Sequence, residues 1–337
     1  MENFFKDVAI DLLPSPKHLN KKMNHFLNDV LKGLQSSPKY LYSKYFYDKK
    51  GDELFQKIMV SKEYYLTNSE MEIFSTQTEE MANTILEKTE NIDVVEFGAG
   101  DATKSVYLLK ELSKRNALND YVPIDISENI IHLLNKTLPG QIPGINIHGL
   151  NGEYLNMLSQ ANQISTTKKL VLFLGANIGN FKFTEMPEFC KKLRNLLSDG
   201  DMVLIGFDLK KDPKKILAAY NDSKGFTSQF NLNLLKRINN ELNANFNLEN
   251  FEHYAMYDPD SGACKSYLVS MEKQKVHLNG SIINFKKDET IFMEISHKYT
   301  ISNIHEIAHQ CGFVPGAYFF DTKKYFVDVI WKCETVK

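Results

Sequence analysis

Residues 93–104 combine an apolar strand with a glycine turn, an arrangement that suits a nucleoside cofactor. Glu96 stands near the end of the strand, Gly98 and Gly100 follow it, and the pattern predicts a helix from about Ser105. Glycine lets a ligand approach the backbone closely, and the first turn of a helix presents unpaired N–H groups. The stretch therefore predicts a cofactor-binding turn at the end of a strand.

The residues around this turn indicate which cofactor it binds. A dinucleotide-binding fingerprint would have a third glycine where this chain has Thr103. A strand that ends in acidic-x-Gly-x-Gly, as Glu96 to Gly100 do, is instead typical of S-adenosylmethionine (SAM) enzymes. Asp125, which we expect at the end of the second strand, can accept hydrogen bonds from both ribose hydroxyls, and Glu153, after the third, can meet an adenine amino group. The ordered set predicts SAM, and the absence of a G-x-x-x-x-G-K motif argues against a P-loop protein.

Alternating strand and helix patterns position these residues. Strands are predicted at 93–97, 120–124, 146–149, 169–174 and 201–206, with helices at 103–115, 127–135 and 184–197. This alternation predicts an α/β fold, a parallel sheet with helices on both faces, whose ligands lie beyond the carboxyl ends of the strands. One edge of the sheet is therefore expected to carry Gly98, Gly100, Asp125, Glu153 and Gly175.

The alternation ends after Asp208, where a different pattern begins. Two helices are expected within 213–245, followed by alternating strand patterns around 251–257, 264–272, 276–285 and 290–297. A helix at 301–310 and a strand at 324–332 close the chain, which is consistent with a return to the first sheet. Residues 1–45 are interpreted as a helical lead-in.

Composition limits the class of protein. The 337 residues suffice for one large or two ordinary domains, with 43% hydrophobic and 24% charged residues. A net charge of −2 gives no electrostatic reason to expect nucleic acid or an anionic membrane as a partner. No apolar run is long enough to span a membrane, no signal peptide is recognisable, and the four cysteines form no C-x-x-C pair. We expect a cytoplasmic protein with reduced thiols.

One motif points to a different chemistry. Residues 305–309 read His-Glu-Ile-Ala-His, which matches the zinc-protease helix signature H-E-x-x-H. No histidine follows His309 to complete the site, and Ile301, Ile304 and Ala308 form an ordinary apolar stripe. We therefore interpret the segment as a surface helix and expect no metal.

Several longer motifs resemble one family. They are PKYLYSKYFYDKKGDELFQKI, KEYYLTNSE, VEFGAGDATK, FLGANIGNF, FEHYAMYD and MEISHKY. From about Pro38 to its end, the chain resembles the SAM-dependent histidine Nα-methyltransferases of ergothioneine biosynthesis, also called dimethylhistidine N-methyltransferases. The resemblance implies a Rossmann-like class I SAM-dependent methyltransferase domain (1–68, 89–209 and 298–337) with an inserted α+β substrate-binding domain (69–88 and 210–297).

The resemblance also implies roles for individual residues. On the cofactor side it implies contacts from Gly98, Gly100, Lys104, Asp125, Glu153 and Tyr154. The amine and carboxylate of an amino-acid substrate would be held by Tyr47, Tyr64, Gly175, Asn180 and Tyr220. Glu294 and Ser296 match the pair that hydrogen-bonds an imidazole, and Tyr47 is the candidate catalytic residue that orients the amine.

Two residues depart from the family pattern. Ser266 stands where a methionine often packs on the imidazole, and Asn177 where a small hydroxyl residue is common. Losing the methionine removes an apolar contact of about 1–2 kcal/mol and leaves room for water or a larger side chain. These departures bear on the substrate and leave the reaction class unchanged.

The sequence thus predicts an enzyme that methylates the α-amine of an amino acid. The expected substrate is L-histidine, and the expected product is the trimethyl betaine hercynine. The alternatives are an N-methyltransferase for another amino acid or amine and, from a different class, a non-catalytic SAM-binding protein. We expect a small-molecule substrate, no nucleic-acid or membrane partner, and a monomeric state.

Overall fold

The structure, a computed structural model, describes residues 16–334 of the chain. The chain divides into two compact units. The smaller comprises residues up to Phe46, Ser228–Tyr254 and Tyr267–Met293, and the larger comprises Tyr47–Thr227, Ala255–Ser266 and the residues from Glu294 onward.

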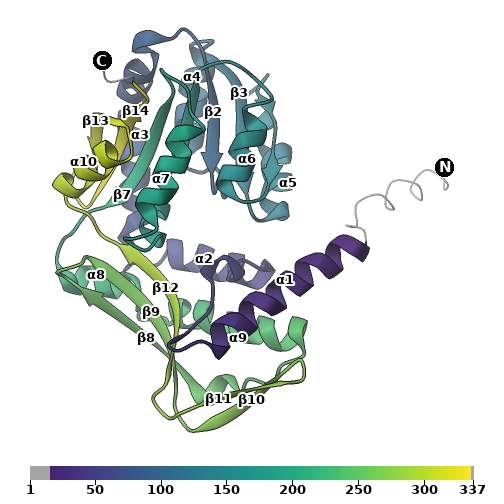
Figure 1. The fold of residues 1–337 in the computed structure, drawn as a ribbon. Helices are drawn as coiled ribbons and strands as arrows, with labels where there is room; N and C mark the ends of the chain where they lie inside the picture. Colours follow the sequence, from purple (N-terminus) through teal and green to yellow (C-terminus); the bar gives the residue numbers. More distant parts are fainter. Residues whose placement is uncertain (1–15, 335–337) are drawn as a thin grey trace. The chain divides into compact units, whose positions relative to one another are not determined.

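A sheet in the order β13-β14-β7-β6-β2-β3-β4 forms the centre of the larger unit (Figure 1). Its strands are β2 (Ile92–Phe97), β3 (Leu118–Asp125), β4 (Asn146–Ile147), β6 (Lys169–Phe173), β7 (Met202–Asp208), β13 (Val314–Phe320) and β14 (Phe326–Lys332). A short β5 (Leu150–Asn151) also pairs with β3. The strands from β2 to β7 pair in parallel, and β14 returns antiparallel to β7. The predicted parallel sheet and the return of the last strand are confirmed.

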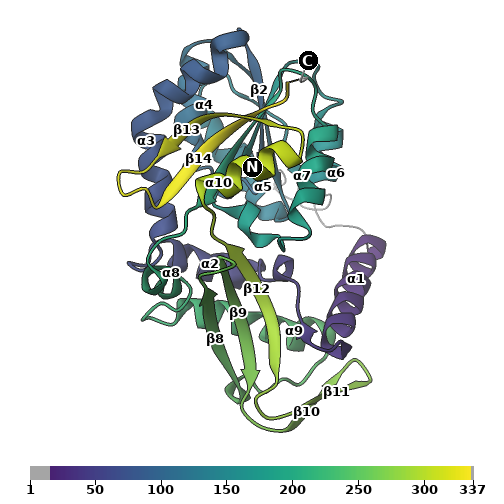
Figure 2. The same cartoon turned by 60° about the vertical axis from the view of Figure 1, so that its left-hand side comes forward.

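Helices cover both faces of this sheet (Figure 2). One face packs against α3 (Tyr65–Ile85), α4 (Ser105–Lys114) and α5 (Glu128–Thr137), and the other against α6 (Tyr154–Ala161), α7 (Met186–Asn195) and α10 (Ile301–Gln310). Alternate strand residues explain the two layers, because Val94 belongs to the first core and Val95 and Phe97 to the second. Two further helices, α2 (Lys49–Met59) and α8 (Pro213–Ala219), complete the described α-helices that lie wholly in this unit.

The position of α3 differs from the expected domain division. Residues 69–88 were expected in the substrate-binding domain, but Ile73, Phe74 and Met81 are fully buried in one core with the strands of the main sheet. The helix carries apolar residues on a face that the sheet covers, so it belongs to the larger unit. This packing could not be predicted, because a helical pattern does not reveal which element the helix packs against.

The smaller unit contains helix α1 (Pro16–Gln35), most of α9 (Phe226–Leu242) and parts of a four-stranded sheet. The sheet has the order β1-β12-β9-β8, with strands β1 (Lys39–Tyr40), β8 (Phe251–Asp258), β9 (Ala263–Ser270) and β12 (Thr290–His297). The helical lead-in predicted for 1–45 is confirmed for Pro16–Gln35, whereas the residues after it form β1 and a short 3-10 helix (Ser43–Tyr45). Residues 1–15 lie outside the described chain.

The stretch 276–285, expected as one strand pattern, is a hairpin. Strands β10 (Gln274–Leu278) and β11 (Ser281–Phe285) pair antiparallel around Asn279 and Gly280. Both turn residues have positive φ, 44° and 81°, which is the geometry that Asn-Gly favours in tight hairpins. The dipeptide was the signal that should have divided the strand.

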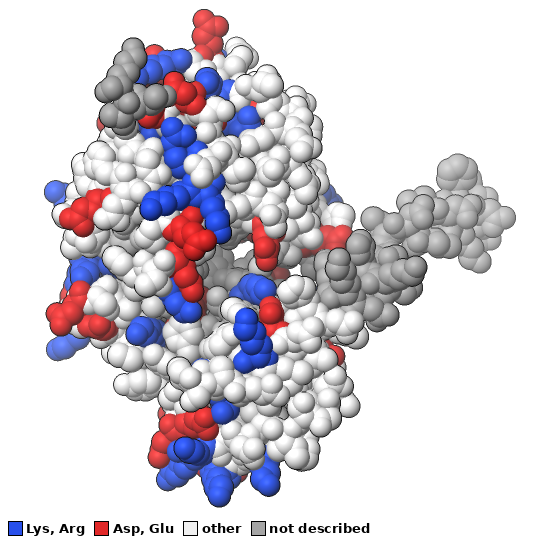
Figure 3. Space-filling model, viewed as in Figure 1, with Lys and Arg blue, Asp and Glu red and all other residues white. Residues whose placement is uncertain are grey.

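Surface and thiol chemistry agree with an ordinary globular chain. Acidic and basic side chains are interspersed on the face drawn in Figure 3. All four cysteines lie within the described residues, where they are buried and unpaired. No helix among residues 16–334 is long and apolar enough to cross a membrane.

The fully buried Phe173 offers a test of this core. Its ring lies 5.6 Å from Phe189 and 5.7 Å from Phe97. Phe173→Ala should lower the free energy of unfolding by about 3–5 kcal/mol because it leaves a cavity. Val60→Ala, at an 83% exposed position, should change it by less than about 0.5 kcal/mol. Urea unfolding followed by circular dichroism measures both, and equal effects would contradict the described packing.

Candidate functional site

Two glycine turns at the carboxyl ends of the central strands form the floor of the candidate site. Gly98 follows β2 with φ 64°, and Gly175 follows β6 with φ 73°. The strand order reverses between these two strands, and such a reversal is where parallel sheets bind ligands. A Cβ at Gly98 would lie 3.0 Å from Tyr154 Oη, and one at Gly175 would lie 3.7 Å from Lys104 Nζ. The fold therefore brings these four predicted residues together.

Asp125 is fixed beside the first turn. Its carboxylate accepts hydrogen bonds from the N–H groups of Gly100 (3.3 Å) and Ser127 (2.8 Å). Burial raises the pKa of this carboxyl, and the backbone donors oppose the shift. An anchored carboxylate at the end of β3 suits the predicted contact with ribose hydroxyls.

The end of β5 leads into the residues predicted to meet the adenine. Glu153 is exposed at the N-cap of α6, and Tyr154 begins the helix. The Tyr154 ring stacks on Phe97 with 4.9 Å between centroids and 8° between planes. This stacking fixes the tyrosine close to Gly98.

Glu70 is a residue of this site that sequence reasoning missed. Its buried carboxylate accepts the Gly175 N–H at 2.7 Å and also pairs with Lys104. It therefore joins the glycine turn after β6 to the predicted cofactor-side lysine. Glu70 is the last residue of the motif KEYYLTNSE, but the motif alone does not show that its carboxylate reaches a glycine turn 105 residues later.

A continuous series of aromatic rings links three of the predicted substrate-binding residues. Ring centroids are 5.8 Å apart for Tyr47 and Phe55, 6.5 Å for Phe55 and Tyr64, and 6.3 Å for Tyr64 and Tyr220. All three pairs meet edge to face, a favourable geometry for aromatic rings. Three tyrosines predicted to bind the substrate, Tyr47, Tyr64 and Tyr220, thus belong to one series of contacting rings.

The electrostatic surroundings of Tyr47 include residues of both predicted sets. Burial raises its pKa well above the ordinary value, and the charge of Glu294 raises it further. Tyr64 from the substrate set and Tyr154 and Asp125 from the cofactor set act on the same hydroxyl. A phenol in these surroundings keeps its hydrogen at neutral pH, so it acts as a hydrogen-bonding group and not as a base.

Residues 294–298 present their alternate side chains to the site. Glu294 and Ser296 share one face of β12 because side chains of a strand alternate, and Lys298, directly after the strand, follows at the same spacing. Tyr220 donates a hydrogen bond to Ser296 Oγ at 2.8 Å. A residue predicted to hold the substrate's amine and carboxylate therefore contacts one predicted to bind the imidazole. Burial raises the pKa of Glu294 to about 7, although the charge of Lys298 opposes the shift.

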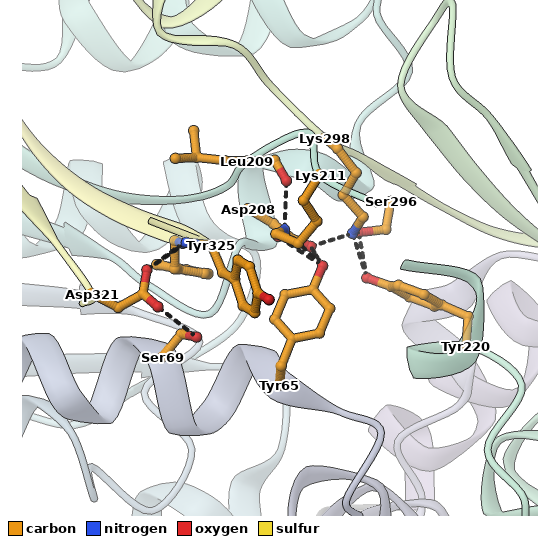
Figure 4. A network of polar contacts seen from close by, with 11 residues as sticks. Tyr65, Ser69, Asp208, Leu209, Lys211, Tyr220, Ser296, Lys298, Asp321 and Tyr325 are labelled. Carbon is orange, nitrogen blue, oxygen red and sulfur yellow. Dashed lines mark hydrogen bonds and ion pairs between the residues drawn. The ribbon is translucent and has the colours of Figure 1, made fainter. Parts of the chain in front are cut away.

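A buried charged network supports these hydroxyl groups (Figure 4). Asp208, the last residue of β7, has no exposed surface and accepts from Lys298 at 2.8 Å, from Lys211, and from the Tyr65 hydroxyl. Lys298 is also buried and donates to Tyr220 and Ser296 at 2.7 and 2.8 Å. Sequence reasoning missed this network, although Asp208 ends a strand as Asp125 does, and Lys298 follows Ser296 at strand spacing.

Asn180, Asn177 and Ser266 are the remaining residues that the sequence singled out. Asn180 is exposed at the end of a short 3-10 helix (Asn177–Asn180), and its neighbour Gly179 lies near Ser296, 3.5 Å from the position of a Cβ. Asn177 lies between the glycine turns, with Nδ2 3.4 Å and 3.5 Å from Cβ positions on Gly98 and Gly175. Ser266 is buried on β9.

The H-E-x-x-H helix has an ordinary surface setting. His305 stacks on Tyr318 with 5.5 Å between ring centroids, and His305, Glu306 and His309 are all exposed. Residues 16–334 contain no cluster of three His, Cys, Asp or Glu side chains suited to a metal ion. That the protein needs no metal stays a prediction.

A mostly parallel sheet, glycine turns after β2 and β6, and a carboxylate at the end of β3 define a class I SAM-dependent methyltransferase. The family described as histidine-specific, SAM-dependent methyltransferases matches residues 26–333. This chain belongs to that family.

Individual relatives agree with this assignment. Histidine N-alpha-methyltransferases from Mycolicibacterium smegmatis and Mycobacterium tuberculosis are both 32% identical to this chain, over 82% and 84% of its length and 85% and 87% of theirs. An L-tryptophan methyltransferase from Psilocybe serbica is 26% identical over 89% of this chain and 90% of its own. The predicted fold class, methyltransferase activity and SAM cofactor are therefore confirmed.

Gly98→Ala tests the cofactor turn. A methyl group there would crowd Tyr154 and hold alanine in a left-handed conformation, so SAM affinity should fall about ten-fold. Gly144→Ala is a matched control, because Gly144 has φ 81° but no atom within 4 Å of its Cβ position. Calorimetric SAM titration compares the two, and equal losses of affinity would show that strain alone is responsible.

Proposed function

We propose that the protein transfers methyl groups from SAM to the α-amine of L-histidine and forms the trimethyl betaine hercynine. The contact between Tyr220 and Ser296 is the observation that carries this proposal, because it joins the residues predicted for the two ends of the amino acid at 2.8 Å. Tyr47 belongs to the aromatic series that reaches Tyr220, and its electrostatic surroundings include Asp125 on the cofactor side and Glu294 on the substrate side. A group so placed can orient the amine that receives the methyl group.

The proposed chemistry needs positioning more than a strong base. SAM, when bound, supplies an electrophilic methyl group. The predicted cofactor residues Gly98, Gly100, Lys104 and Asp125, with Glu153 and Tyr154, would hold the donor. The acceptor amine must be neutral before each attack, and because Tyr47 remains a phenol, we assign the amine's proton to solvent. Tyr47 would orient the amine's lone pair, which is a contribution of geometry.

The substrate would be recognised at both ends. Tyr64, Gly175, Asn180 and Tyr220, with Tyr47, would surround the amine and carboxylate. Glu294 and Ser296 would read the imidazole, whose two ring nitrogens offer one donor and one acceptor in the neutral form. A buried polar pair left unmatched by another side chain discriminates strongly against it.

Ser266 supports a second candidate function within the same class. A serine in place of a packing methionine leaves room for a larger acceptor, and one relative is named an L-tryptophan methyltransferase. A non-catalytic SAM-binding protein would need no residues to bind a methyl acceptor, so the aromatic series that contains the predicted substrate-binding tyrosines argues against that alternative. The monomeric state, cytoplasmic location and absence of nucleic-acid and membrane partners stay predictions.

The substrate can be identified by product mass. Incubated with SAM and each amino acid in turn, the protein should add up to three methyl groups to histidine and few to tyrosine or tryptophan. Glu294→Ala should weaken histidine binding at least ten-fold, as expected for a lost hydrogen bond to a charged group, and leave SAM binding unchanged. Methylation of tryptophan without histidine would make the second candidate correct.

The pH dependence of histidine binding tests Glu294. With a pKa raised to about 7, its carboxyl takes up a proton as the pH falls below neutral and accepts a hydrogen bond less strongly. The imidazole becomes cationic over a similar range, about pH 6.5. The KM for histidine should therefore rise steeply between about pH 7 and pH 5, and less steeply in Glu294→Gln. Identical profiles for the two proteins would remove Glu294 from this role.

A further inference from the structure

Lys298 is a buried cation with three defined partners. Its ammonium group lies 2.8 Å from Asp208 Oδ2, 2.7 Å from Tyr220 Oη and 2.8 Å from Ser296 Oγ. It also lies 4.5 Å from the centroid of the Tyr220 ring. An ammonium group has three hydrogens and no lone pair, so these three contacts use its full capacity.

This geometry determines how Ser296 can bind a ligand. Lys298 can only donate, so it occupies one lone pair on Ser296 Oγ. Tyr220 donates to the same oxygen at 2.8 Å and occupies the second. A hydroxyl group has two lone pairs and one hydrogen, so only the hydrogen of Ser296 is left to face a ligand.

We propose that Lys298 is a positioning residue that makes Ser296 an obligatory hydrogen-bond donor, so that the acceptor pocket selects a neutral imidazole. This inference rests on the proposed function, since it assigns the imidazole to Glu294 and Ser296. Glu294 accepts the ring N–H, and Ser296 donates to the unprotonated ring nitrogen. A cationic imidazolium has no acceptor nitrogen, and neither has an indole ring.

The second lysine on Asp208 provides a matched control. Lys211 instead contacts Asp208, the Tyr65 hydroxyl and the Leu209 carbonyl. Lys298→Met and Lys211→Met each remove one cation from Asp208 and leave the other in place. Only the first removes the donor that acts on the ligand-facing hydroxyls.

The experiment compares histidine and SAM binding to the two variants by calorimetry. Lys298→Met should lower the affinity for histidine about ten-fold or more, the effect expected when a hydrogen bond to a charged group is lost, and should leave the affinity for SAM unchanged. Lys211→Met should change histidine affinity less than about three-fold. In a Ser296→Ala background, Lys298→Met should reduce histidine affinity much less than it does in the unmodified protein, because Lys298 acts through Ser296. Equal losses in the two lysine variants, or additive losses in the cycle, would overturn the inference.

Substrate analogues test the same point on the unmodified protein. The two β-pyrrolylalanines each keep one ring N–H and lack the acceptor nitrogen. Both should bind at least about ten-fold more weakly than histidine, and Ser296→Ala should reduce that difference. A pyrrolyl analogue that binds as well as histidine would overturn the inference while leaving the proposed function intact. Failure of the unmodified protein to bind histidine would overturn both.

Discussion

Backbone conformation at the ends of two central strands is the constraint on which the site depends. Gly98 and Gly175 turn the chain in the left-handed region directly after β2 and β6, where an L side chain would be strained. These turns place Tyr154 and Lys104 beside the reversal of strand order. Glu70 then secures the second turn by accepting its N–H. The cofactor side is thus largely a property of the backbone, supported by a few buried side chains.

The acceptor side is organised by buried charge instead. Asp208 has no exposed surface and interacts with two lysines, an arrangement that is tolerable because each charge has close partners. From this centre, Lys298 reaches the Tyr220 and Ser296 hydroxyls. A site fixed in this way distinguishes ligands by the direction of hydrogen bonds as well as by shape.

The sequence predicted what periodicity and turn chemistry encode. The parallel sheet, the glycine turns and Asp125 at a strand end followed from local patterns, and the substrate residues followed from family motifs. Glu70 and Lys298 stand inside the motifs KEYYLTNSE and MEISHKY, and Asp208 ends a strand, but their roles were missed because these depend on partners far away in the chain: 105 residues separate Glu70 from Gly175. Two features of the fold were also missed. The packing of α3 on the sheet depends on tertiary contacts, and the division at Asn279–Gly280 depends on a two-residue turn signal inside a strand pattern.

The pairing of β14 with β7 has a consequence for biosynthesis. β7 is buried along its whole length, and β14 covers the hydrogen-bonding edge that faces away from β6. Residues 326–332 are made more than a hundred residues after β7, so the nascent sheet has an unpaired apolar edge for most of that interval. Exposed edges of this kind recruit other strands. Ribosomal stalling or a premature stop before residue 326 would therefore yield an aggregation-prone chain, even though every proposed ligand contact had already been synthesised.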